Sequence, residues 1–107
     1  MSQYTPDRWV VLELISPKQT IRKVFAGWYG GYLGSDSWKL NSGITEVREQ
    51  DDVFEFDGYS GSTYFCHRNS YGMSGYMHSV LASWIRQAEE RGDTKISIIE
   101  LEDLFVS

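Results

Sequence analysis

The sequence predicts an α+β protein: a strongly twisted or barrel-like antiparallel sheet of five to six short strands with one C-terminal amphipathic helix packed on it. Alternating and β-branched or aromatic runs, separated by glycine-rich turns, fill most of the first 76 residues. After them the apolar spacing changes to three and four residues, the period of a helix. We expect one domain (1–107), because a chain of 107 residues buries about two thirds of its unfolded surface around a single core.

Two strands are expected near the start of the chain. The segment from Arg8 to Ile15 alternates, with an apolar residue at every even position from Val10 to Leu14. Ser16-Pro17-Lys18-Gln19 then supplies turn residues. The next strand, from Ile21 to Tyr29, is β-branched and aromatic and runs into the glycine-rich loop from Gly30 to Gly34.

Three more strands are expected in the middle of the chain. Trp38 to Val47 is the third strand, and the Ser42-Gly43 pair within it predicts a bulge, since an interior glycine weakens a strand unless the chain bends there. The segments Val53 to Phe56 and Thr63 to His67 are separated by the turn residues Gly58 to Ser62, so we expect these two strands to form a hairpin.

One helix and one further strand are expected towards the C-terminus. The residues of the helix's apolar face are Met77, Val80, Leu81, Trp84, Ile85 and Ala88. Ser74 or Ser79 is expected to cap the first turn, and Gly92 to end the helix. The segment Lys95 to Leu101 is apolar enough to form the last strand.

The chain is acidic, with a net charge of −5, and the acids are unevenly spread. One segment, residues 46–57, holds six acids against Arg48. They are Glu46, Glu49, Asp51, Asp52, Glu55 and Asp57. This balance argues against generic nucleic-acid binding, which needs a basic face. An acidic hairpin is instead typical of a surface that steers a basic protein partner, or of a solvated face that only maintains solubility.

Neither a membrane segment nor a cofactor motif is expected. No apolar run approaches the roughly 18 residues of a membrane-spanning helix, and the N-terminal residues lack the features of a secretory signal. Cys66 is the single cysteine, which excludes an intramolecular disulfide and favours a reducing, cytoplasmic location. Neither of the two histidines has a carboxylate at ligand spacing, so no metal site is expected.

Cys66 and His67 are the residue types of a thiolate catalyst, but they are adjacent in an expected strand. Adjacent side chains of a strand point to opposite faces, so we expect the two not to share a site and Cys66 to be buried. No phosphate loop, dinucleotide fingerprint, nucleophile elbow or metalloprotease motif occurs. No catalytic residue is therefore predicted.

The pentapeptide pattern Gly-Tyr-x-Gly-Ser occurs twice, at Gly31 to Ser35 and at Gly58 to Ser62. We expect the two glycine-rich loops to converge at one end of the sheet and to present rings, hydroxyls and cations to a ligand or partner. The candidate contact residues are Trp28, Tyr29, Tyr32, Asp36, Trp38, Lys39, Tyr59, Ser60, His67, Arg68, Asn69 and Tyr71.

Three uses of these residues remain open. The rings can complete a small core; they can form a protein-binding surface, where Trp, Tyr and Arg are over-represented; or they can hold a nucleotide or another small anionic ligand. In the last case Arg68 and Lys39 would meet phosphate, while Trp38 or Tyr71 would stack on a base.

Several segments carry a resemblance. They are Arg8-Trp9-Val10-Val11-Leu12, Ala26-Gly27-Trp28-Tyr29-Gly30-Gly31-Tyr32, Ser37-Trp38-Lys39-Leu40-Asn41-Ser42-Gly43-Ile44, Ser60-Gly61-Ser62-Thr63-Tyr64, and Cys66-His67 with Tyr71-Gly72. This layout resembles short uncharacterised proteins encoded by tailed bacteriophages. The resemblance supplies no active site; it implies an accessory protein made in the bacterial cytoplasm, of the kind that inhibits host enzymes or host defence.

The sequence therefore predicts a non-enzymatic binding protein that inhibits or sequesters a host protein through the aromatic loops and the acidic hairpin. The alternative is a module that binds or sequesters a nucleotide through the same loops. An enzyme that uses His67 as a general base is the third hypothesis.

Overall fold

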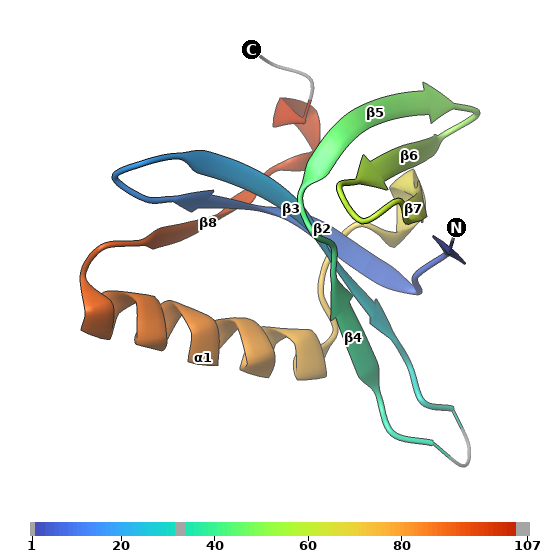
Figure 1. The fold of residues 1–107 in the computed structure, drawn as a ribbon. Helices are drawn as coiled ribbons and strands as arrows, with labels where there is room; N and C mark the ends of the chain where they lie inside the picture. The colour runs from blue at the N-terminus through green and yellow to red at the C-terminus, as the bar shows by residue number, and fades with distance from the viewer. Residues whose placement is uncertain (1, 32–33, 105–107) are drawn as a thin grey trace.

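The computed structural model describes residues 2–31 and 34–104. In these residues, eight strands and one long helix follow one another (Figure 1). The strands are β1 (Gln3–Tyr4), β2 (Arg8–Ile15), β3 (Thr20–Trp28), β4 (Ser37–Leu40), β5 (Ile44–Gln50), β6 (Val53–Gly58), β7 (Thr63–His67) and β8 (Lys95–Ile99). The helix α1 spans Gly75–Arg91, and 3-10 turns occur at Arg68–Ser70 and Leu101–Asp103.

The strands form two four-stranded sheets. One, which we call the hairpin sheet, has the order β1-β7-β6-β5, and the other, the helix-bearing sheet, has the order β4-β3-β2-β8. Within these sheets the strand pairs are antiparallel, except that β1 runs parallel to β7. The α+β class with antiparallel sheets is thus confirmed, whereas the expected single twisted or barrel-like sheet is wrong: among the described residues there are two sheets and no closed barrel.

The second sheet arises where one expected strand breaks. Trp38 to Val47 was expected to be continuous, but the chain leaves the helix-bearing sheet after Leu40 and enters the hairpin sheet at Ile44. Gly43 has φ +135°, a conformation that side-chain-bearing residues rarely adopt. The expected bend at Ser42-Gly43 is therefore a crossing between two sheets instead of a bulge within one.

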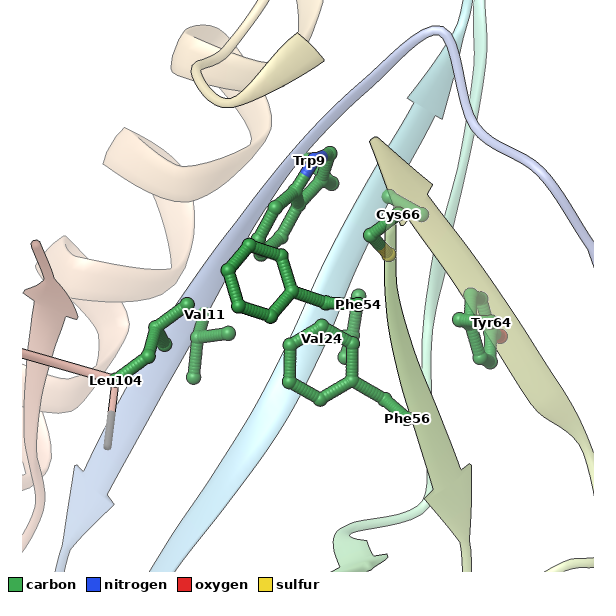
Figure 2. Close-up of a cluster of buried hydrophobic side chains, with 9 residues drawn as sticks. Trp9, Val11, Val24, Phe54, Phe56, Tyr64, Cys66 and Leu104 are labelled. Carbon is green, nitrogen blue, oxygen red and sulfur yellow. The ribbon is translucent and has the colours of Figure 1, made fainter. Parts of the chain in front are cut away.

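Alternation in β2 gives the helix-bearing sheet two buried faces. Trp9 and Val11 face the hairpin sheet, while Val10 and Leu12 face the helix. Figure 2 shows the first face, where β2 and β3 side chains meet Phe54 and other side chains of β6 and β7. We call this cluster the inter-sheet core, and the cluster beneath α1 the helix core.

Trp9 is the centre of the inter-sheet core. Its side chain is fully buried, its ring lies 5.6 Å from that of Phe54 and 5.5 Å from that of Phe56, and its Nε1–H donates to the carbonyl of His67 at 2.7 Å. The indole therefore both fills the space between the sheets and fixes the end of β7.

The helix begins and ends as the sequence predicts. Ser74 is the N-cap, and its hydroxyl accepts the Met77 N–H at 3.2 Å. Gly92 closes the helix in the left-handed conformation, with φ 75°. Met77 and Leu81 anchor the apolar face in the helix core. Layer order is thus hairpin sheet, helix-bearing sheet and helix (Figure 1).

Candidate functional site

A groove runs along β4, which is an edge strand of the helix-bearing sheet. Its volume is about 480 Å³. It is lined by Tyr4, Lys23, Trp38, Lys39, Leu40, Asn41, Ser42, Ser60, Ser62 and Tyr64. Trp38, Lys39 and Leu40 are consecutive, and consecutive side chains of a strand point to opposite faces. One cavity touches all three because it follows the edge of the strand rather than one face of the sheet.

The two faces of β4 differ in chemistry. Trp38 packs on the helix side, with its ring 4.9 Å from that of Trp84 and 6.0 Å from that of Phe25. Lys39 pairs with Ala26 of the inter-sheet core and so lies on the opposite side, where its Nζ is 5.0 Å from the centre of the Tyr4 ring. The groove thus has an aromatic wall on one side of β4 and a cation on the other.

The polar groups of the groove are mainly hydrogen-bond donors. Lys23 and Lys39 both line the groove, as do four residues with hydroxyls: Ser42, Ser60, Ser62 and Tyr64. Lys23 shares the helix side of β3 with Phe25, whereas Lys39 lies on the inter-sheet side of β4. Its lining includes no Asp or Glu among the described residues, although the chain carries a net charge of −5. The groove is therefore a cationic patch on an acidic protein, which favours an anionic ligand.

Asn41, at the end of β4, has a buried side-chain amide. Its side chain is 4% exposed, and its Oδ1 accepts the N–H of Val24 at 2.9 Å, which holds the amide in place. Within the described part of the chain, its buried Nδ2 donates to no protein acceptor. A buried donor without a partner costs about 1–3 kcal/mol. Because this Nδ2 atom is enclosed beside Gly58, the cost is borne within the protein and the atom is not a contact point of the groove.

The second glycine-rich turn closes onto the crossing between the sheets. The Ser60 N–H donates to Ser42 Oγ at 2.9 Å, and the Tyr59 N–H donates to the Gly43 carbonyl at 3.1 Å. These bonds bring Ser60 to the groove beside β4. Trp38 and Lys39 of β4 therefore line the same groove as Ser60 of the second turn, but no described residue of the first glycine-rich loop, Gly30 to Gly34, lines it.

The remaining residues of the second region lie elsewhere. Tyr71 pairs with Trp9, which pairs with Ala26, which pairs with Lys39, so Tyr71 and Lys39 lie three strands apart. At about 4.8 Å per strand, that is about 14 Å. Arg68 forms ion pairs with Glu49 and Asp52, and its guanidinium lies 4.8 Å from the centre of a phenylalanine ring in β6. The single patch expected from both loops does not include Arg68 or Tyr71.

Three residues of the first region have structural contacts of their own. The Trp28 Nε1–H donates to the Thr5 carbonyl at 3.0 Å, and Asp36 Oδ1 accepts the N–H of Gly30 at 3.0 Å. Tyr29 is half exposed, and its backbone N–H donates to an Asp7 carboxylate oxygen at 2.9 Å. Tyr32 lies outside the described residues.

Three residues of the second region are exposed. Tyr59 is 75% exposed, with its ring beside Gly43. His67 and Asn69 are exposed at the end of β7 and in the turn that follows it. None of these three side chains lines the groove.

The acids of the β5–β6 hairpin pair largely within the hairpin. Arg48 binds both carboxylate oxygens of Asp57, at 2.9 and 3.0 Å, and lies within 3.5 Å of Glu46 and Glu55. The bonds from Arg48 and Thr63 hold the pKa of Asp57 below its ordinary value. Since Arg68 also pairs with two acids, the field of the acidic face is weaker than the sequence alone implies.

The sulfur and imidazole that suggested thiolate chemistry are separated. Cys66 lies in the inter-sheet core, where burial raises the pKa of its thiol, whereas His67 is exposed on the other face of β7. Cys66 and His67 therefore do not share a site. Among residues 2–31 and 34–104, no group of three His, Cys, Asp or Glu side chains is placed to hold a metal ion.

No family model, curated protein sequence or solved structure matches this chain. In the portion that the structure describes, no helix has the length and apolar character needed to cross a bilayer.

Sequence reasoning missed several residues of the groove: Tyr4, Lys23, Leu40, Asn41, Ser42 and Tyr64. A usable signal was present in Asn41-Ser42-Gly43, since polar residues before a glycine within an apolar strand mark a break. Lys23 carried no such signal, because its place beside β4 depends on strand pairing between distant segments.

Proposed function

We propose that this chain is a non-enzymatic binding protein that holds an anionic group of its ligand in the β4 groove. The observation that carries the proposal is a groove beside β4 that is lined by Lys23, Lys39 and four hydroxyl-bearing residues and, among the described residues, by no Asp or Glu. Phosphate and carboxylate groups accept several hydrogen bonds and carry the charge that a lysine ammonium group such as that of Lys39 neutralises. Trp38, 38% exposed, supplies a ring face for an apolar or planar part of the same ligand.

A thermal-shift titration tests this proposal. Inorganic pyrophosphate and a panel of nucleoside triphosphates serve as probes, and binding to the folded state raises the melting temperature. Lys39→Gln is expected to remove most of the shift. Lys18→Gln is the matched control, because Lys18 lies in the β2–β3 turn and does not line the groove. Equal shifts in the wild type and in both variants would place any anion binding elsewhere.

A host protein as the target of the acidic hairpin is the second candidate. Asp51 and Asp52 at its tip favour it, since both are exposed and the Asp52 side chain is 80% exposed despite its pair with Arg68. Reversal of both charges should slow association with a basic partner and flatten its salt dependence. If the resemblance to phage proteins holds, the partner of this second candidate is a bacterial enzyme or defence factor in the host cytoplasm, which the chain would inhibit.

A further inference from the structure

We infer that the anionic group in the β4 groove belongs to an extended peptide, which binds as an added strand on the open edge of β4 and places an acidic or phosphorylated side chain beside Lys39. This inference rests on the proposed function and adds to it the class of ligand. It follows from three features of β4: its backbone edge, the difference between its faces, and its charge.

The backbone edge of β4 is available for pairing. β4 is hydrogen-bonded to β3 on one side, and on its other side no strand of the described residues pairs with it. The Asn41 N–H donates to the Val24 carbonyl at 3.0 Å, and backbone groups alternate in direction along an antiparallel strand. The N–H and C=O groups of Lys39 therefore point to β3, while those of Trp38 and Leu40 point to the open edge. An incoming strand meets two donors and two acceptors there.

The groove has the shape that an added strand requires. It is lined by the consecutive residues Trp38, Lys39 and Leu40, as a cavity beside the edge of the strand is, so a strand lying beside β4 would occupy it lengthwise with side chains alternating between the two faces of the sheet. On the inter-sheet face those side chains meet Lys39, Asn41 and the serines of the β6–β7 turn. A free phosphate would use only this half of the groove.

The helix face of β4 continues into an apolar cavity. This second cavity, of about 200 Å³, is lined by Leu12, Leu14, Leu40, Trp84, Gln87, Arg91 and Ile96. Leu40 lines both cavities, so they adjoin at β4. A strand with an anionic side chain on one face therefore has apolar contacts for its neighbouring side chains on the other. The expected motif is an acidic or phosphorylated residue flanked on each side by an apolar residue.

The charge of Lys39 selects among incoming strands. Lysine on an edge strand normally discourages pairing with another chain, because its ammonium group would be desolvated without a partner. An anionic side chain at the facing position removes that penalty, whereas a lysine there increases it. β4 is thus protected against neutral strands and open to an anionic one.

The test uses short fluorescein-labelled peptides of alternating valine and threonine, with phosphoserine, glutamate, serine or lysine at the centre. Fluorescence anisotropy is expected to show binding of the phosphoserine and glutamate peptides, and at least about tenfold weaker binding of the serine and lysine peptides, a difference of about 1.4 kcal/mol. Lys39→Gln should remove this preference, and Lys18→Gln should preserve it.

Backbone N-methylation tests strand addition itself. Two versions of the phosphoserine peptide are methylated at alternate amides, so that one version loses the N–H groups facing β4 and the other loses those facing away. One version should lose binding, and the other should bind like the parent peptide. Equal binding of both versions would overturn strand addition.

The two proposals fail separately. Lys39-dependent binding of pyrophosphate without binding of any peptide would overturn this inference and leave the proposed function intact. Peptide binding that Lys39→Gln does not weaken would contradict both. Circular dichroism and the melting temperature of each variant establish that it is folded.

Discussion

The phenol ring of Tyr71 stands edge-on to the indole of Trp9, with centroids 5.1 Å apart and planes at 89°. Tyr71 is partly buried, and its hydroxyl donates to the carbonyl of Ile99 at the end of β8. Together with the Trp9–Tyr71 bridge, these contacts join the segment before the helix to β2 and to the last strand. Tyr71 is therefore a structural residue, which explains why it does not contribute to the groove.

Tyr71→Phe is expected to cost about 1 kcal/mol at neutral pH, because it removes the hydroxyl that bonds Ile99. Desolvation and nearby acids raise the pKa of Tyr71 to about 12. The folded state thus favours the protonated form, and this contribution to stability is complete below pH 10 and is lost as the pH rises towards 12. Denaturant unfolding between pH 8 and pH 12 should show a smaller alkaline loss in Tyr71→Phe; equal losses would contradict the assignment.

Asp51→Asn combined with Asp52→Gly is expected to stabilise the protein by about 0.5–1 kcal/mol. The two residues form the β5–β6 turn with φ 53° and 62°, and Asn-Gly is the preferred pair in a turn with two positive φ angles. Urea denaturation measures the effect. Asp52→Asn alone removes the charge but not the side chain from the positive-φ position. If this variant gains more unfolding free energy than the double variant, the loss of charge and not the turn conformation is the cause.

Asp57→Asn is expected to flatten the acid side of the stability profile. The folded state lowers the pKa of Asp57, so the carboxylate contributes stability above its unfolded pKa of about 3.9, and this contribution is lost as the pH falls through the folded value. The difference in unfolding free energy between wild type and variant should shrink as the pH falls from 6 to 3. Asp93→Asn, at an exposed acid after α1, is the matched control for the removal of one negative charge.

Gly27→Ala is expected to destabilise the protein by about 1–3 kcal/mol. A Cβ at this position would lie 2.3 Å from Sδ of Met77, which is fully buried beneath the helix. Gly75→Ala, where nothing lies within 4 Å of the added carbon, is the matched control and should be neutral or stabilising. Thermal unfolding of both variants checks this; equal Tm values would show that Met77 moves aside freely.

Much of the fold follows from local patterns. Alternation in β2 predicted which residues share a face, and the spacing and caps of α1 predicted its position, because these features depend on residues close together in the chain. That the face of Trp9 is buried against a second sheet was not predicted. The division into two sheets was not predicted, since it depends on one crossing at Asn41 to Gly43 and on the pairing of β1, a strand of two residues, with β7.

The site was predicted less well than the fold. Trp38, Lys39 and Ser60 line one groove, but which lysine, amide and hydroxyl join them depends on long-range pairing. Arg68 was assigned to a ligand from its residue type alone, and the structure gives it two carboxylates of the acidic hairpin as partners. The sequence identifies residues whose side chains are able to bind a ligand. The fold decides which of these side chains already pair with other residues of the protein.

The most direct test of the β4 groove is an NMR titration of ¹⁵N-labelled protein with inorganic pyrophosphate. The backbone signals of Lys39, Asn41 and Ser60 report on the groove, because all three residues line it, two from β4 and its end and one from the β6–β7 turn. We expect the largest shifts at these three residues, with saturation that Lys39→Gln abolishes. Shifts centred on Arg68 and Tyr71, or an unchanged Asn41 signal at saturation, would contradict the proposed site.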